Sequence, residues 1–279
     1  YQVYVPRDKA DHLLVGQLLR VAGTSRLNGS VTEVACEVLE YLDVDSIPSA
    51  IALLPVSRCP RAAQPSIPIL SDLEHSLPVG LRRFMMRVLL DPRITLPLQT
   101  CKGSTAHHHA AEGGLLVHSS QMLPAIKPLC AAVLPQEPDA WAYASLGFLF
   151  HDIGKLMTVG STVYPPVRRG LRHESEGLWL LAPHLDWLDG FDPTSSAVLR
   201  YVFDFVATPA AERKQGKYLV ADIVVMLDRL SAGADNRRGK ADLLRRALGM
   251  AAANGASDSL KHHRQQVEGD RGEGALEET

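Results

Sequence analysis

Apolar residues recur at helical spacing along much of this chain. Near the N-terminus, residues 10–22 and 30–42 place apolar side chains three or four positions apart, which predicts two helices. Ser30 followed by Glu33 has the capping-box pattern expected at the start of the second helix. Further along, the stretch LRRFMMRVLL at 81–90 has the clearest helical pattern. No alternating pattern predicts a strand, so the sequence indicates an all-α fold.

Two stretches without helical patterning divide the chain. Pro, Ser and Arg crowd residues 55–68, which predicts a linker or a long loop. Beyond about residue 250 the chain becomes rich in Ala, Gly and charged residues, which is typical of a disordered tail. We therefore expect a smaller helical N-terminal region with its linker at 1–70, a main helical domain at 71–248 and a disordered tail at 249–279.

The composition is that of an ordinary soluble globular protein, with 46% hydrophobic and 22% charged residues. A net charge of −2 gives no global electrostatic case for nucleic acid, so such binding needs a local basic patch. No run of eighteen apolar residues and no signal peptide is present, so we expect no membrane partner. The cysteines form no CxxC pair, which argues against a zinc ribbon and favours a reducing, cytoplasmic location. They are Cys36, Cys59, Cys101 and Cys130.

Histidines are concentrated in one part of the chain. Four of the eleven lie within twelve residues, in TAHHHAAEGGLLVHSS: His107, His108, His109 and His118. A fifth, His151, directly precedes Asp152 in FLFHDIGK, after an apolar stretch (AYASLGFLF) that predicts a buried helix. Because adjacent residues on a helix point about 100° apart, the two can ligate one ion only at an irregular or terminal turn. Gly154 supplies such a break.

These residue types suit a transition metal and phosphate chemistry. Imidazole together with carboxylate favours Mn, Fe, Ni or Zn over Ca or Mg, which prefer oxygen ligands. Such an ion acidifies water and polarises a phosphoryl oxygen, and Lys155 places a cation beside it. An isolated His-Asp pair more often caps a helix, and a histidine triplet is more often a solvated loop. The conjunction of GGLLVH with HDIGK, each attached to an apolar helical run, favours the metal site.

HHHAAEGGLLVH followed by FLFHDIGK resembles the HD superfamily of metal-dependent phosphohydrolases, over about residues 75–235. Within it, the pattern is most similar to the HD-type (MOBH) relaxases of conjugative plasmids and integrative conjugative elements. The resemblance implies an HD-domain helical bundle, one or two divalent ions (Mn or Fe), and nicking of single-stranded DNA alongside other conjugation proteins. HD-type 3′–5′ exoribonucleases carry a related pattern, so an RNA- or nucleotide-directed phosphohydrolase is an alternative. A non-catalytic HD binding module is another, and it predicts missing or misplaced ligands.

The resemblance also assigns metal ligands. It implies that His118 is the first ligand, that His151 and Asp152 are the central pair, and that a later aspartate closes the site. Asp222 and Asp228 both qualify for that last position, and they are six positions apart and hence on different helix faces. Asp228 is favoured because its DRLS context resembles the Asp-x-x-Ser ending of the family.

A second ion would require a further histidine between these segments. His173, at an expected helix start in GLRHESEG, matches that position. His184 follows a proline among apolar residues, so packing is its better interpretation, although a ligand role is left open. The residues expected to act in catalysis or substrate positioning are Asp152, Lys155, His107, His108 and His109.

Two further features bear on the site. Pro124 and Pro128 should kink or end the helix that follows His118. A basic loop, YPPVRRGLRHE, immediately precedes His173, and its Arg168, Arg169 and Arg172 are expected to bind a phosphodiester backbone. Tyr164 in that loop could stack a base or simply pack. The other basic clusters, at 82–87 and 229–246, are better explained as solvated faces.

Overall fold

The computed structural model describes residues 2–6, 18–105, 109–159, 166–214 and 216–233. The chain divides into two compact units, Tyr1–Ser231 and Ala232–Thr279. Only residues 232 and 233 of the second unit are among the described residues. The predicted tail at 249–279 lies outside the described residues, and the predicted domain boundaries stay predictions.

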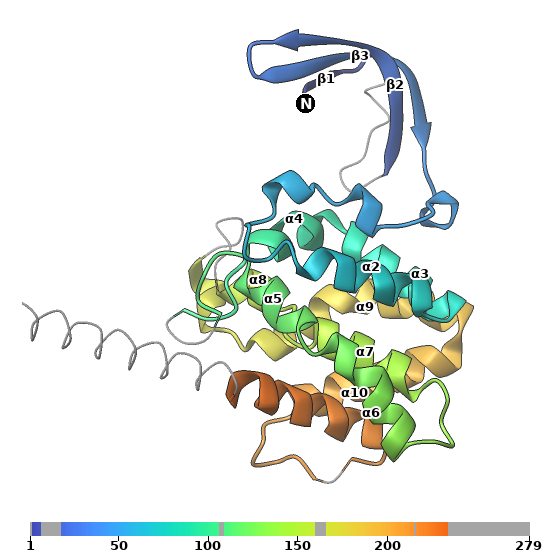
Figure 1. Ribbon diagram of the computed structural model, residues 1–279, viewed down its shortest axis with the longest axis vertical. Helices are drawn as coiled ribbons and strands as arrows, with labels where there is room; N and C mark the ends of the chain where they lie inside the picture. The colour runs from blue at the N-terminus through green and yellow to red at the C-terminus, as the bar shows by residue number, and fades with distance from the viewer. Residues whose placement is uncertain (1, 7–17, 106–108, 160–165, 215, 234–279) are drawn as a thin grey trace, which may run out of the picture. The chain divides into compact units, whose positions relative to one another are not determined.

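The first unit is mostly helical, as the sequence predicted (Figure 1). Residues 219–233 form a last helical stretch. The other α-helices are α2 (Ser66–Ser76), α3 (Val79–Leu90), α4 (Pro92–Thr100), α5 (Gly114–Ser120), α6 (Leu123–Val133), α7 (Ala140–Phe150), α8 (Lys155–Thr158), α9 (His173–Phe191) and α10 (Pro193–Ala207). Short 3-10 turns are η1 (Val44–Ser46), η2 (Ile51–Leu53), η3 (Val56–Arg58) and η4 (Pro166–Gly170).

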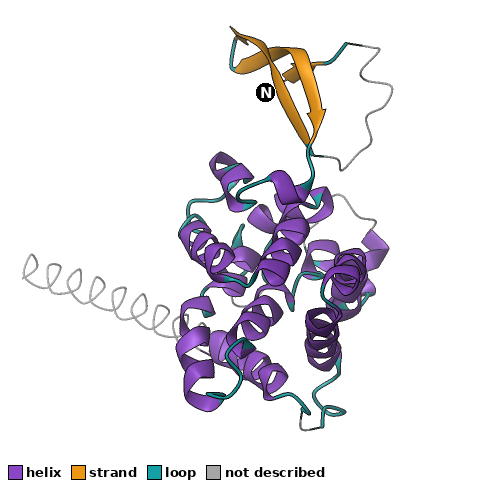
Figure 2. Ribbon diagram, turned by 90° about the vertical axis from the view of Figure 1, so that its right-hand side faces the viewer, coloured by secondary structure: helices purple, strands orange, loops and turns teal. Residues whose placement is uncertain are grey.

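The N-terminal region contains strands, and the helix predicted at 30–42 is wrong (Figure 2). The strands β1 (Gln2–Tyr4), β2 (Leu19–Asn28) and β3 (Val31–Tyr41) form a sheet of order β1-β3-β2. β2 and β3 are antiparallel and pair from Leu19↔Tyr41 to Asn28↔Val31, which leaves a two-residue turn.

The helix predicted at 10–22 is also wrong where it can be seen, because residues 19–22 belong to β2. Residues 10–17 lie outside the described residues. Ser30 is a turn residue between β2 and β3, and the Glu33 carboxylate accepts hydrogen bonds from Arg26 and Asn28 rather than capping a helix. These side chains cross from strand to strand, so the polar pattern that suggested a helix start serves the pairing of β2 with β3 instead.

The proline-rich stretch at 55–68 is a packed loop rather than a free linker. It contains η3 and runs into the start of α2, and its Cys59 and Ala63 are buried in the core. The predicted boundary between residues 70 and 71 falls inside α2.

α7 is the central helix of the core. Its sequence AWAYASLGFLF is buried along most of its length, as predicted, and it contacts α5, α6 and α10. Phe150 near its end meets Phe84 of α3 edge to face, with ring centroids 6.2 Å apart. Because α7 is surrounded by helices, whatever follows its last residue emerges inside the bundle. None of the described helices is long and apolar enough to cross a membrane.

Candidate metal centre

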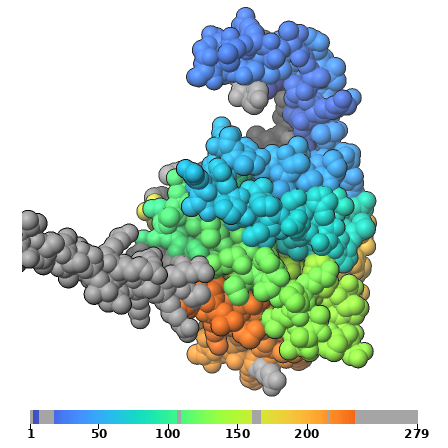
Figure 3. Space-filling view, in the orientation of Figure 1, coloured from blue at the N-terminus to red at the C-terminus, as the bar shows by residue number. Residues whose placement is uncertain are grey.

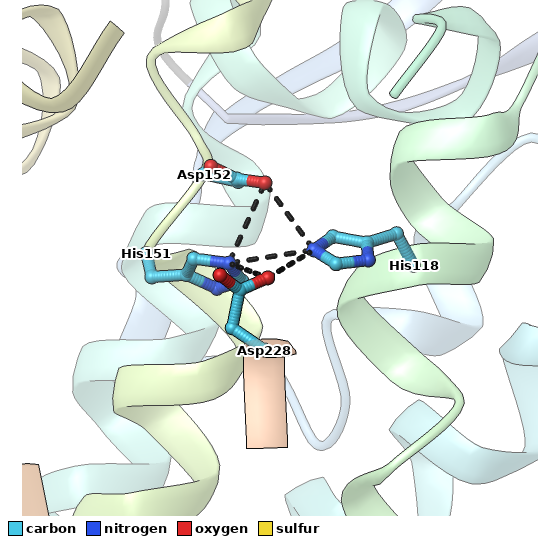
Figure 4. A group of neighbouring side chains, drawn as sticks. All are labelled: His118, His151, Asp152 and Asp228. Atoms are coloured by element: carbon cyan, nitrogen blue, oxygen red, sulfur yellow. Dashed lines mark hydrogen bonds and ion pairs between the residues drawn. The ribbon is translucent and has the colours of Figure 1, made fainter. Parts of the chain in front are cut away.

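Four side chains converge where α7 ends (Figure 4). The ligand atoms of His118, His151, Asp152 and Asp228 all lie within 4.8 Å of one another. The His118 Nε2 atom is 3.2 Å from Asp152 Oδ2 and 3.3 Å from Asp228 Oδ1. The His151 Nε2 atom is 3.4 Å from each of the same two oxygens. The first three residues are buried and Asp228 is partly exposed, so the cluster opens on the Asp228 side.

The His-Asp pair lies at a terminal turn, as the sequence predicted. α7 ends at Phe150, His151 is its C-cap, and the chain turns through residue 154 before α8 begins. Gly154 has an ordinary φ of −65°, so it is not needed for a left-handed conformation. A Cβ there would stand 1.8 Å from the carbonyl oxygen of His173. Glycine is required because the first turn of α9 passes directly against this turn.

His118 comes from α5, and two glycines set the start of that helix. Gly113 has a φ of +75°, which favours glycine. A Cβ on Gly114 would lie 2.0 Å from the carbonyl oxygen of His109, so the backbone of His109 packs directly against the helix start. The predicted break after His118 is confirmed, since α5 ends at Ser120 and Pro124 lies in the first turn of α6. Pro128, however, lies inside α6 and does not end it.

Both imidazole rings present Nε2 to the centre because Nδ1 is engaged elsewhere. The Nδ1–H of His151 donates to the carbonyl oxygen of Phe148 at 2.7 Å. His118 Nδ1 lies 3.0 Å from the hydroxyl oxygen of Ser231. Outer hydrogen bonds of this kind orient metal-ligating histidines. The sequence did not assign Ser231 an orienting role, although its three-residue spacing from Asp228 places both on one helix face.

The charges in the cluster stabilise one another. Burial alone would raise the pKa of Asp152, but the charge of His151 and the hydrogen bond from His118 hold it well below its usual range. Burial alone would likewise lower the pKa of His118, but hydrogen bonds to Asp152 and Asp228 outweigh it and raise the pKa to about 9. Without a metal, the cluster therefore holds a proton between two carboxylates, at the place where a cation would bind.

Two predicted residues flank Asp152 without joining the group of four. The Lys155 ammonium is 2.5 Å from Asp152 Oδ2. His173 is the first residue of α9, as predicted, and its Nε2 lies 3.2 Å from Asp152 Oδ1, the oxygen on the other side of the carboxylate. The His173 side chain is one-third exposed. The only potential metal group among the described residues is the group of four. A ligand role for His173 therefore stays a prediction.

The remaining histidine and aspartate candidates have different outcomes. Asp222 accepts a hydrogen bond from the Gly216 amide rather than facing the centre. His184 lies 3.0 Å from Asp91, away from the group of four, which agrees with the interpretation of His184 as a packed residue. The His109 ring lies 5.3 Å from the His118 ring, beside the centre. His107 and His108 lie outside the described residues, so their predicted roles stay untested.

The predicted phosphate-binding arginines are largely engaged by other groups. Arg168 pairs with Glu176 at 2.9 Å. Arg172 donates to the carbonyl oxygen of Ala207 at 2.6 Å. Arg169 is exposed, and Tyr164 lies outside the described residues. The role of these arginines in substrate binding stays a prediction.

Comparisons of the chain with family models, curated proteins and solved structures gave no match. The interpretation of the site therefore rests on its geometry and on its sequence motifs.

Proposed function

We propose that this chain is a metal-dependent phosphodiesterase that acts on nucleic acid, with nicking of single-stranded DNA in the manner of a conjugative relaxase as its activity. The observation that carries the proposal is the convergence of His118, His151, Asp152 and Asp228 within 4.8 Å. These residues come from three segments that are far apart in the sequence. Binding of a divalent ion requires several polar side chains whose ligand atoms face one point, and these four side chains have that arrangement.

The donor set fits a transition metal. Two imidazole nitrogens and two carboxylates favour Mn, Fe or Zn over Ca and Mg. The Phe148 carbonyl and the Ser231 hydroxyl hold the two rings with Nε2 inward, as outer partners of metal ligands do. We propose manganese or iron as the ion. The single group of four among the described residues supports one ion rather than two.

An ion held there would supply Lewis acidity towards a phosphoryl oxygen and would lower the pKa of water. The residues of the chain supply the rest. The Lys155 ammonium, 2.5 Å from Asp152 Oδ2, places a positive charge at the edge of the centre, where it would neutralise charge on the phosphate. The Nε2–H of His173 donates to Asp152 Oδ1. Because Nε2–H is engaged by Asp152, a proton for the leaving oxygen would come from Nδ1 of this partly exposed ring, which lies 3.6 Å from Glu174 Oε2.

The competing hypotheses differ in ways that can be tested. A non-catalytic binding module predicts missing or misplaced ligands, whereas the ligands of this chain converge. An RNA- or nucleotide-directed phosphohydrolase uses the same chemistry on another substrate. The preference for DNA rests on the resemblance of the triple-histidine and HDIGK motifs to relaxases.

The test is a metal analysis coupled to a substrate panel. The full chain is loaded with Mn or Fe and assayed on single-stranded DNA, RNA and free nucleotides. We expect cleavage of single-stranded DNA, and loss of both metal and cleavage in Asp152→Ala. Asp186→Asn, a matched change at an exposed aspartate of α9, should alter neither. Full metal content and turnover in Asp152→Ala would refute the assignment.

A further inference from the structure

A pocket of about 450 Å³ lies on the outer side of the helix that carries Asp228. Its volume is within the range of small-molecule sites, roughly 300–1,000 Å³. Three cationic residues line it, Arg213, Lys214 and Arg229, and we call it the basic pocket. Val225 and Met226 of the same helix form an apolar wall. The lining therefore combines cationic groups that suit an anion with an apolar surface.

The basic pocket and the metal centre lie on neighbouring sides of one helix. Asp228 points into the centre, and Arg229, the next residue, lines the pocket. Adjacent helical residues point about 100° apart, and their Cα atoms are about 3.8 Å apart. Figure 3 shows this part of the chain, in orange, at the surface beside the green part that contains α5 and α6. Successive residues of one helix therefore belong to the metal centre and to the basic pocket.

Arg213 is held rigidly at the pocket. Its Nε and Nη2 atoms donate to the carbonyl oxygens of Phe205, Val206 and Thr208 at the end of α10. Its guanidinium also lies over the Phe205 ring, 5.5 Å from the centroid. The charge is therefore fixed in place before any ligand binds, which lowers the entropy that binding costs.

Among its described lining residues, the pocket has three cationic side chains and one carboxylate. None of the three cations forms an ion pair with another described residue, in contrast to Arg168, which pairs with Glu176. Asp222 is the one carboxylate on the lining, and it accepts a hydrogen bond from the Gly216 amide. Burial lowers the pKa of Arg213 and the like charge of Arg229 lowers it further, while the charges of Asp228, Asp222 and Glu174 act in the opposite direction. An anion between Arg213 and Arg229 would relieve their mutual repulsion.

We propose that the basic pocket binds a nucleotide of the substrate strand, beside the phosphodiester that is cleaved at the metal centre. The phosphate lies on Arg213, Lys214 and Arg229, and the base or sugar packs against Val225 and Met226. This inference rests on the proposed function and gives that site a polynucleotide substrate rather than a small one. It also changes the interpretation of Arg229 from a solvated residue to a substrate contact.

The test measures binding of single-stranded oligothymidylate and of thymidine monophosphate to the full chain in EDTA, so that no metal contributes. Arg229→Gln is the main variant, because Arg229 is exposed and its removal disturbs no hydrogen bond of the described residues. We expect it to weaken oligonucleotide binding about tenfold. The slope of log affinity against log salt concentration should fall by about 0.7. Arg200→Gln, which removes an exposed arginine of α10, should change neither quantity.

Unchanged affinity and salt slope in folded Arg229→Gln would overturn the inference. Thymidine monophosphate that binds as tightly as the oligonucleotide would also overturn it, because the pocket would then serve a free nucleotide. Metal content measured in parallel separates this inference from the proposed function. A wild-type chain that takes up no metal contradicts the proposed function. A chain that takes up metal, but whose oligonucleotide affinity in EDTA does not depend on Arg229, contradicts only the pocket.

Discussion

Metal binding by this chain should release a proton from His118. In the metal-free protein, burial opposes protonation of this ring, but hydrogen bonds to the Asp152 and Asp228 carboxylates outweigh burial and raise its pKa to about 9. At neutral pH the His118 ring is therefore protonated, and Nε2, which faces the centre, carries a hydrogen. A metal that takes this nitrogen as a ligand must displace the proton.

The size of the loss in metal affinity follows from the pKa of His118. For each pH unit below this pKa, the apparent metal affinity falls about tenfold, or ~1.4 kcal/mol. From the His118 pKa of about 9 down to neutral pH, the affinity should thus fall about a hundredfold. The direction of the pH dependence is fixed, because the apparent metal affinity rises with pH and levels off once the His118 ring is neutral.

The stability of the metal-free chain should change in the opposite direction. The pKa of His118 is raised from a usual value of 6.5, so its stabilising contribution is complete below that pH and is lost as the pH rises through about 9. The shift corresponds to about 3 kcal/mol of unfolding free energy.

Competition with a chelator across this pH range gives the affinity, and calorimetry in two buffers of different protonation enthalpy counts the released protons. An affinity that is flat across the range, with no proton released, would refute the electrostatic account of His118.

Three further predictions follow from side chains around the centre. Gly154→Ala should destabilise the protein by about 1–3 kcal/mol in thermal unfolding, because its Cβ would meet the His173 carbonyl oxygen at 1.8 Å; an unchanged melting temperature would show that the contact is loose. His173→Gln should lower turnover at full metal content, and the matched His184→Gln, which removes a hydrogen-bond contact with Asp91, should leave turnover unchanged; equal turnover in both would remove the proton-donor role of His173. Replacing all three histidines at 107–109 by Ala should slow cleavage of single-stranded DNA, and unaltered cleavage would mark them as surface residues.

Local signals in the sequence predicted the helical core and the placement of the His-Asp pair. The uninterrupted apolar run of α7 identifies a buried helix, and the residue after its end must lie inside the bundle. Proline at 124 predicted the break after His118 because its ring cannot continue a helix from the preceding turn.

Features that depend on contacts between distant segments could not be predicted in the same way. The apolar spacing within 30–42 fits a helix as well as a strand, and pairing with β2 decides the outcome. The need for glycine at 154 arises from the backbone of His173, nineteen positions away. The same holds for Arg172, whose partner is the carbonyl oxygen of Ala207.

The sequence could only partly predict which of Asp222 and Asp228 faces the metal centre. Helical periodicity shows only that they occupy different faces, and the hydrophobic pattern of the helix does not say which face meets the histidines. The Asp-x-x-Ser spacing favoured Asp228, and the contact between Ser231 and His118 gives that motif a physical reason.

Metal content per chain, measured by mass spectrometry after loading with Mn or Fe and removal of free ions, shows whether His118, His151, Asp152 and Asp228 hold a divalent ion. We predict one ion in the wild-type chain, one in Asp222→Asn and none in Asp228→Asn, because the two aspartates share a helix and only Asp228 faces the histidines. Equal metal content in the two variants, or no metal in the wild-type chain, would contradict the account.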